Sequence, residues 1–336
     1  MSLSYKAKHR WSKFWKIALL TVLALILACI LRFIYLERFL VYDENGVHLD
    51  YGGKTVYAPD EPQSSTKDDF VLKQEEGNIH AGPVASLYRG FSLRAGQILN
   101  ANSRRALSEN LADCNAVMLE MKTNTGKFLY ATSLSQGQTA NFDLNAMSAW
   151  LEELRAVPGL KLIAKLPAFQ DSAFALADYS HALAIRNGAL WMDENGSYWL
   201  DPANSEVVDY LVNAARELHN LGFDEVVFEN FHFPDSSNIV YAGKSGKEAA
   251  LAAAKEVKER LDLWGIEVSF LSTDEEIVAL GQRVYLTVES GAQVEDEAAR
   301  YADLIGTETG RLVFCIDSRD TRFDDYSKLA PFEIAK

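Results

Sequence analysis

Cysteine is scarce in this chain, which has three cysteines among 336 residues. Cys29 lies inside a long apolar run, so only Cys114 and Cys315 remain for the rest of the chain. Two cysteines do not make the dense disulfide framework of small secreted domains, and no cysteine or histidine spacing resembles a zinc site. We therefore expect two small, buried thiols, no metal site and no cofactor.

Basic residues are in short supply outside the N-terminal segment. The formal net charge is −14, from 33 basic and 47 acidic residues. The first 36 residues contain six basic residues and no acidic one, so the rest of the chain is strongly acidic. Because phosphate binding needs a basic surface, nucleic acid is excluded as a partner. The hydrophobic fraction of 48% is typical of a folded protein.

One long hydrophobic run is present, from Ile17 to Leu36, and it is apolar except for Arg32. About 20 such residues match the hydrocarbon core of a bilayer, so this run predicts a transmembrane helix at residues 17–36. The basic residues before it indicate a cytoplasmic tail at residues 1–16 and a body outside the cell membrane. A cleaved signal peptide or a lipoprotein signal at Cys29 are the alternatives.

Residues 37–81 form a predicted β-hairpin and a linker. Apolar and polar residues alternate on both sides of Asn45-Gly46, a pair typical of a two-residue hairpin turn. Residues 58–69 combine proline, serine and charge without an apolar period, which indicates an exposed connection. The main folded domain is therefore expected at residues 82–336.

Strand and helix patterns alternate through that domain. Strands are expected near residues 85–90, 116–121, 160–166, 225–230, 266–271, 284–288 and 311–316, with an eighth in the last twenty residues. Helical patterns occupy residues 145–157, 205–222 and 246–265, and Asp201 with Pro202 is expected to begin the second of them. Such alternation predicts a parallel sheet covered by helices. The domain's length of roughly 250 residues favours a TIM (β/α)8 barrel, either closed or incomplete.

The stretch GFDEVVFENFHFP, residues 222–234, brings polar side chains to the end of one strand. Functional groups of a TIM barrel lie at the C-terminal ends of its strands. Since side chains alternate along a strand, Glu229 points into the barrel mouth if Val227 points into the barrel. A structural ion pair with an inward-facing base is the alternative role for Glu229.

Further polar residues follow the neighbouring strands. Glu120 and Lys122 share one face of the second strand and its extension, and Lys165 lies on the third strand. Acids and lysines that converge from three strands indicate a polar ligand site. We expect Lys122 and Lys165 to contact the ligand, together with Asn230 and His232 after the fourth strand. Trp191 and Trp199, on a loop, are candidates for stacking on sugar rings, although aromatic residues also fill cores.

Four stretches of the chain resemble the bacterial family called putative glycosyl hydrolase domain. They are GFDEVVFENFHFP, AVMLEMKTNTGKFLY, LIAKLPAFQD and GALWMDENGSYWLDPANSEVVDY, and they lie within residues 84–234. The family consists of extracytoplasmic barrels that are distantly similar to chitinase-type and amylase-type glycosidases. The resemblance therefore implies a TIM barrel that acts on an envelope or extracellular polysaccharide.

The resemblance also implies roles for particular residues. Glu229 matches the family's aspartate at a strand end, and Glu120 and Lys122 match its aspartate and lysine. Asn230 stands where the family has tyrosine, and His232 where it has arginine.

The second half of the chain departs from the family. VSFLSTD replaces a fifth strand like VSADVFG, and LVFCIDSRD stands where PMVYPSHY is expected. Glycoside hydrolysis usually requires two carboxyl groups. Glu229 is the first candidate for the proton donor, with Glu120 or Asp317 as its partner. The alternative is an inactive barrel that binds a glycan or a partner in the cell envelope.

Overall fold

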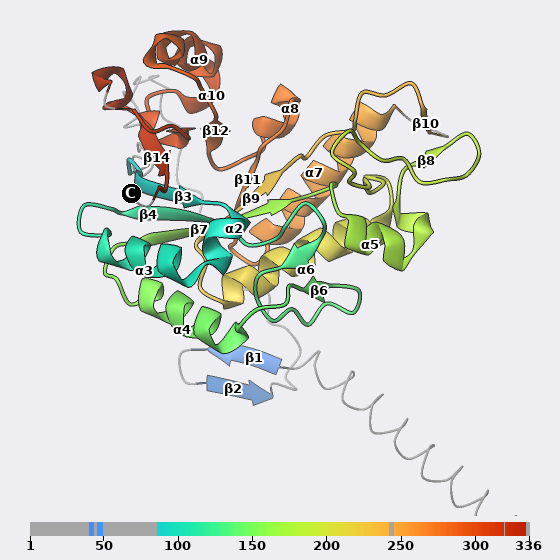
Figure 1. Ribbon diagram of the computed structural model, residues 1–336, viewed down its shortest axis with the longest axis horizontal. Coiled ribbons are helices and arrows are strands. Elements are labelled where there is room, and N and C mark those ends of the chain that lie inside the picture. Colours follow the sequence, from blue (N-terminus) through green and yellow to red (C-terminus); the bar gives the residue numbers. More distant parts are fainter. Residues whose placement is uncertain (1–39, 44–45, 50–85, 242–244, 319, 334–336) are drawn as a thin grey trace, which may run out of the picture. The chain divides into compact units, whose positions relative to one another are not determined.

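The computed structural model describes residues 40–43, 46–49, 86–241, 245–318 and 320–333 (Figure 1). The chain divides into two compact units, residues 1–78 and 79–336. In the first unit, β1 (Leu40–Asp43) and β2 (Gly46–Leu49) pair as an antiparallel hairpin, as expected around Asn45-Gly46. The apolar segment 17–36 lies outside the described residues. No described helix is both long and apolar enough to cross a bilayer.

The second unit is built on eight parallel strands. In chain order these are β3 (Arg89–Leu93), β4 (Ala116–Glu120), β7 (Lys161–Pro167), β9 (Glu225–Glu229), β11 (Glu267–Phe270), β12 (Val284–Leu286), β13 (Leu312–Phe314) and β14 (Ser327–Pro331). The strands β3, β4, β7, β9 and β11 form one series in which each strand pairs with the next, and β12, β13 and β14 form a second such series. The last strand, β14, pairs with the first, β3. This arrangement is the TIM-type barrel that the alternating pattern predicts.

The barrel is nearly closed. The strands β11 and β12, both fully described, do not form a ladder with each other. Two hydrogen bonds cross between their segments instead: Gln282 N donates to the Val268 carbonyl oxygen at 2.9 Å, and Arg283 N donates to Ser269 Oγ at 2.9 Å. The ring of strands is therefore complete except for regular pairing at this seam.

The first strand begins four residues later than expected, at Arg89. Gly90, expected to end this strand, lies inside it and is paired with Ala116 of β4. A Cβ atom on Gly90 would lie 1.8 Å from the Ala116 carbonyl oxygen, so this position tolerates only glycine. The expected eighth strand is present as β14.

Helices cover the outside of the strands, as Figure 1 shows for α3, α4, α6 and α7. In chain order the helices are α2 (Ala95–Leu99), α3 (Ala101–Glu109), α4 (Leu144–Arg155), α5 (Ser172–Ala177), α6 (Ser205–Asn220), α7 (Gly246–Asp262), α8 (Glu275–Val278), α9 (Val294–Arg300) and α10 (Ala302–Ile305). Short strands β5 (Lys127–Phe128), β6 (Gln138–Thr139), β8 (Ala184–Ile185) and β10 (Ile239–Val240) lie in the connections. The sequence patterns locate α4, α6 and α7 to within a few residues.

Helix α6 begins later than its sequence suggests. Asn204, rather than Asp201, accepts the capping hydrogen bond, from Glu206 N. Asp201 accepts hydrogen bonds from Ala203 N at 2.8 Å and from the Tyr241 hydroxyl at 3.2 Å. The expectation that Asp201 caps the helix was therefore wrong, because residues 201–204 form a turn before the helix.

Apolar side chains fill the barrel interior. The buried members of this inner cluster are Tyr88, Ala116, Met118, Ile163, Val227, Tyr285, Val313 and Leu329. A separate, larger cluster packs between the strands and the helices. Since Val227 faces inward, the alternation along β9 turns Glu229 toward the barrel mouth, as expected.

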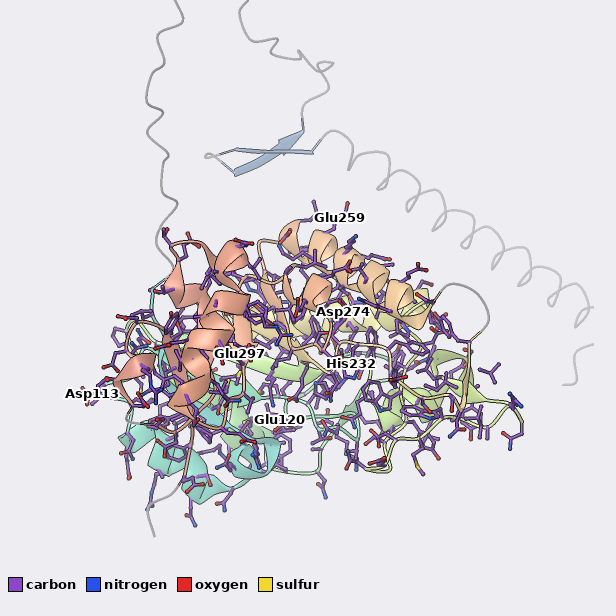
Figure 2. All side chains as sticks on the ribbon, turned by 90° about the horizontal axis from the view of Figure 1, so that it is seen from above. Asp113, Glu120, His232, Glu259, Asp274 and Glu297 are labelled. Carbon is purple, nitrogen blue, oxygen red and sulfur yellow. The ribbon has the colours of Figure 1, made fainter. Side chains whose placement is uncertain are left out.

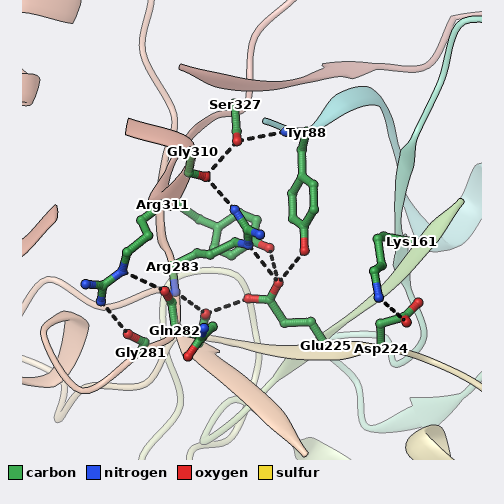
Figure 3. Close-up of polar contacts among 12 residues, drawn as sticks. Tyr88, Lys161, Asp224, Glu225, Gly281, Gln282, Arg283, Gly310, Arg311 and Ser327 are labelled. Atoms are coloured by element: carbon green, nitrogen blue, oxygen red, sulfur yellow. Dashed lines mark hydrogen bonds and ion pairs between the residues drawn. The ribbon is translucent and has the colours of Figure 1, made fainter. Parts of the chain in front are cut away.

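A fully buried carboxylate, Glu225, lies at the opposite end of β9 (Figure 3). It accepts hydrogen bonds from Ser269 Oγ at 2.6 Å and from the Tyr285 hydroxyl at 2.9 Å. Arg283 Nε lies 3.7 Å from it and the guanidinium stacks on Tyr88. These groups come from strands on both sides of the β11–β12 seam, so this network joins the two sides where regular pairing is missing.

Candidate functional site

A cavity of about 710 Å³ opens at the C-terminal ends of the barrel strands. We call it the mouth cavity. It is lined by Ser92, Leu93, Arg94, Gly96, Gln97, Met118, Lys165, Glu229, Leu271, Thr287, Cys315, Pro331, Phe332 and Glu333. Acidic, basic and apolar side chains meet in it, which is typical of a site for a polar ligand.

Glu229 and Lys165 lie side by side in the mouth cavity. The Lys165 ammonium group donates to Glu229 Oε1 at 3.1 Å, and the two side chains are 18% and 29% exposed. Adjacent strands hold both residues, since β7 and β9 pair in parallel and Pro167 lies opposite Glu229. The two expectations for Glu229, a mouth position and an ion pair with an inward-facing base, are thus both met.

Cys315 belongs to the same wall of the mouth cavity and is a free thiol. Burial raises the pKa of this thiol to about 12, while the nearby Lys165 lowers it and Glu229 raises it. Such a thiol stays protonated at neutral pH and is a poor nucleophile. Any chemistry in the cavity therefore falls to its other polar groups.

Glu120 ends β4 but does not line the mouth cavity. Its Oε2 atom accepts a hydrogen bond from Ala95 N, the first residue of α2, at 3.0 Å. Figure 2 labels Glu120 and shows it among the strands and helices of the folded unit. Glu120 lies opposite Lys165 in the β4–β7 ladder, and its carboxylate contacts the segment after β3.

Lys122 is turned away from the mouth cavity. Its side chain is 1% exposed, and its ammonium group lies 2.8 Å from Asp171 Oδ2, whose side chain is fully buried. The Tyr210 hydroxyl donates to the same Asp171 oxygen at 2.7 Å. Lys122 therefore lies outside the lining of the mouth cavity: β4 ends at Glu120, and Lys122 forms a bridge with Phe128. The alternation along the strand no longer applies there.

Asp317 also lies apart from the mouth cavity. The strand β13 ends at Phe314, and Asp317 is an exposed residue beyond it that does not line the cavity.

Glu333 is a lining residue that the sequence analysis missed. It follows β14 by two residues and lines the mouth cavity with Glu229. The missed signal was SKLAPFE, a short apolar stretch that ends in a carboxylate, as the fourth strand does.

A second, smaller pocket of about 390 Å³ lies beside the fourth strand. We call it the acidic pocket. It is lined by Asn124, Gln170, Asp193, Glu194, Asn195, Trp199, Asn230 and His232. It contains Asp193 and Glu194 but neither lysine nor arginine, so its charge differs from that of the mouth cavity.

Hydrogen bonds fix the wall of the acidic pocket. Asn230 Nδ2 donates to Gln170 Oε1 at 2.8 Å, and Gln170 Nε2 donates to Asp193 Oδ2 at 2.6 Å. Trp199 Nε1 donates to the same oxygen at 2.8 Å. Burial raises the pKa of the Asp193 carboxyl, but these bonds and those from Ser197 N and Asn195 N hold it below its usual value. The wall thus keeps a negative charge.

The backbone places the two pockets on one short segment. Asn230 has a φ of 55°, in the left-handed region that few residues other than glycine adopt. Consecutive residues therefore serve different pockets, since Glu229 lines the mouth cavity and Asn230 the acidic pocket.

The aromatic candidates contribute unequally. Trp199 is buried and lines the acidic pocket, and its ring lies 5.2 Å from that of His232. Trp191 does not line either pocket and packs edge-on against Trp199 at 6.0 Å.

Burial lowers the pKa of His232, which Figure 2 labels, and its Nδ1 atom is buried without a hydrogen-bond partner in the described part of the chain. His232 is therefore a neutral imidazole in the pocket wall at neutral pH.

Within the described residues, no group of three or more His, Cys, Asp or Glu side chains comes together in an arrangement that could hold a metal ion.

Solved structures with similar folds include glycosidases. A hypothetical protein from Ruminiclostridium thermocellum is 20% identical, with a TM-score of 0.47 over 56% of this chain and 98% of the other. An α-galactosidase from Lactobacillus brevis is 10% identical, with a TM-score of 0.51 over 73% of this chain. This chain spans only 38% of the length of that enzyme, and the similarity shows the fold alone.

Sequence comparison identifies the family. No curated protein sequence matches this chain. The family model described as "Putative glycosyl hydrolase domain" matches residues 101–272, just over half of the chain and including β4, β7, β9 and β11. The chain belongs to this glycosyl hydrolase domain family.

Proposed function

We propose that the chain is a glycoside hydrolase whose active site is the mouth cavity. The observation that carries this proposal is the placement of Glu229, a carboxylate held at the end of a barrel strand in an open cavity of about 710 Å³. Carboxyl groups at such positions perform the proton transfer and nucleophilic steps of glycoside hydrolysis. Family membership supports the same reaction class.

The contact with Lys165 suits Glu229 to one of the two carboxyl roles. A proton donor must be neutral before the reaction, whereas a nucleophile or a base must be charged. The ammonium group at 3.1 Å is a partner for the charged form. We therefore assign Glu229 the role of nucleophile or base, in place of the proton donor expected from the sequence.

The acidic pocket is proposed to bind a neighbouring sugar unit of the same polysaccharide. Sugars present hydroxyl groups, which the side-chain amides of Asn124, Gln170 and Asn230 can both donate to and accept from. Because Asp193 and Glu194 are not balanced by a basic residue there, the pocket disfavours anionic sugars. Neutral sugars and sugars with a free amino group fit it better.

Anchoring to the cell membrane is proposed from composition. The apolar run at residues 17–36 and the basic residues before it support a single transmembrane helix with the barrel outside the membrane. The polysaccharide would then belong to the envelope or the extracellular space. Protease treatment of intact cells should degrade the barrel if this orientation holds, whereas protection in intact cells and digestion after lysis would contradict it.

The test of hydrolysis is turnover of a panel of p-nitrophenyl glycosides and of neutral and amino-sugar polysaccharides by the full-length protein. Glu229→Gln, which keeps the shape of the side chain, should reduce turnover by about 10³-fold or more without abolishing substrate binding. Glu259→Gln is the matched control, since Glu259 projects from the outer surface of α7 (Figure 2). Turnover that persists unchanged in Glu229→Gln would place the reaction elsewhere.

A barrel that binds glycans without cleaving them is the second candidate. The observation that favours it is that both carboxylates expected as a pair have partners, Glu229 with Lys165 and Glu120 with Ala95 N. Calorimetric binding of an oligosaccharide by wild-type protein that shows no turnover of the whole panel would establish this alternative.

A further inference from the structure

We infer that Glu333 is the second carboxyl group of the reaction and acts as its proton donor across the mouth cavity from Glu229. This inference rests on the proposed hydrolase function. Glu333 and Glu229 are the two carboxylic acids among the described residues that line the cavity. Both lie at the C-terminal end of a barrel strand: Glu229 is the last residue of β9, and Glu333 comes two residues after β14.

The order of the strands places the two residues on opposite sides. Between β9 and β14, the paired strands β7, β4 and β3 lie on one side of the ring, and β11, β12 and β13 lie on the other. Three strands therefore separate them in each direction, so β9 and β14 face each other across the barrel. A sugar bound between them has one carboxyl group on each of two faces, as glycoside hydrolysis requires.

The segment that carries Glu333 is held in place although the strand has ended. The preceding residue, Phe332, is buried and donates its backbone N–H to the Ser92 carbonyl oxygen at 2.9 Å. Its ring packs edge-on against Phe91 at 5.2 Å. Gln97 also donates a side-chain hydrogen bond to the Phe332 carbonyl oxygen. Glu333 therefore projects from an anchored residue, which is the support that a catalytic side chain needs.

The other candidates for this role are engaged or lie elsewhere. Glu120 accepts a hydrogen bond at the start of α2, and Asp317 does not line the cavity. Lys165 provides Glu229, and not Glu333, with a positive partner in the described part of the chain. Glu333, exposed at the rim, is thus the carboxyl group that can exchange protons with solvent between turnovers.

The proposed step balances without a cofactor. Glu333 gives its proton to the glycosidic oxygen while the bond between that oxygen and the anomeric carbon breaks, which releases an alcohol. Water supplies the hydroxyl group that ends on the anomeric carbon. Its proton passes to Glu229 when water attacks directly, or to Glu333 when water attacks an ester formed first between the sugar and Glu229. Either route ends with one proton on the carboxyl pair, as it began.

The test compares Glu333→Gln with wild-type protein, in the full-length chain, on two aryl glycosides of the same sugar. The p-nitrophenyl leaving group needs more protonation than the 2,4-dinitrophenyl group. We expect Glu333→Gln to lower kcat/KM about 10²- to 10⁴-fold for the first substrate and less than tenfold for the second. A loss of structure would lower both rates equally. Glu259→Gln, with a carboxyl removed from an outer helix, should leave both rates unchanged.

Three results are distinguishable. A fall in kcat/KM of Glu333→Gln that is larger for the p-nitrophenyl substrate than for the 2,4-dinitrophenyl substrate supports Glu333 as the proton donor. Equal rates for Glu333→Gln and wild-type protein on both substrates, or an equal drop on both, overturn this role and leave the hydrolase function standing. Wild-type protein that cleaves neither these substrates nor the polysaccharides overturns the hydrolase function and the role of Glu333 with it.

Discussion

The Lys165 ammonium group and the Glu229 carboxylate are 3.1 Å apart on adjacent strands at the mouth of the barrel. The proposed reacting group is therefore held by two hydrogen-bonded strands, β7 and β9. The lysine fixes the orientation of a partly buried carboxylate, which a nucleophile or base needs.

Replacing Lys165 with methionine should therefore impair turnover more than folding. We expect kcat/KM on the best aryl glycoside to fall by about 10²-fold, because Glu229 loses the ammonium group that orients its carboxylate. Lys161→Met is the matched control from the same strand, since Lys161 pairs with Asp224 at the opposite end of β7. Equal activities for the two variants would show that the ion pair has no part in the reaction.

Lys122→Met should behave in the opposite way. The variant leaves Asp171 buried without its cation, and breaking a buried ion pair costs about 3–5 kcal/mol of unfolding free energy. Urea unfolding monitored by circular dichroism measures this loss. Lys127→Met, which removes a nearby exposed lysine, should change stability by less than about 0.5 kcal/mol. A large rise in KM with unchanged stability would instead return Lys122 to the ligand site.

Glu225 should make stability depend on pH. Burial raises the pKa of this carboxyl above its ordinary value of 4.5, although Ser269, Arg283 and Tyr285 lower it. Between the ordinary and the raised value the folded state binds more protons than the unfolded state, so the free energy of unfolding falls as pH rises. Glu225→Gln removes this term.

The difference in unfolding free energy between Glu225→Gln and wild-type protein should therefore shift in favour of the variant as pH rises above 4.5. Urea titrations at a series of pH values measure it. The control Glu259→Gln should follow the wild-type profile, because Glu259 is exposed. A difference that shifts the other way would mean that the network holds Glu225 charged.

Trp199→Phe tests the acidic pocket separately from the reaction. The variant keeps an aromatic ring but removes the Nε1 donor to Asp193, so the pKa of that carboxyl should rise. We expect KM for an oligosaccharide to increase several-fold while kcat stays within twofold, since the change affects binding and not the reacting groups. A fall in kcat at constant KM would show instead that the indole acts on the reaction.

The sequence predicted the barrel because strand and helix periods alternate clearly in it. The same reasoning correctly turned Glu229 toward the mouth, because side chains alternate along the whole of β9. It misplaced Lys122 and Asp317, since β4 and β13 end before those residues and the alternation ends with them. A strand pattern alone does not show where the hydrogen-bonded ladder stops.

Other features depend on partners that are distant in the sequence. The Glu225 network brings together residues of β9, β11 and β12 and the residues just before β3 and β12, and no local pattern marks it. Gly90 was expected at the end of a strand, whereas it lies inside β3 and permits close contact with Ala116. Glu333 was missed because Pro331 interrupts the strand pattern just before it.

The pairing of β14 with β3 has a consequence for how the protein is made. The backbone of Tyr88 donates to Ser327 Oγ across 239 positions of the chain. The first strand therefore emerges from the ribosome long before the strand that completes its hydrogen bonding. Between the synthesis of β3 and that of β14, one edge of β3 has no partner strand, and an unpaired strand edge promotes aggregation of the nascent chain.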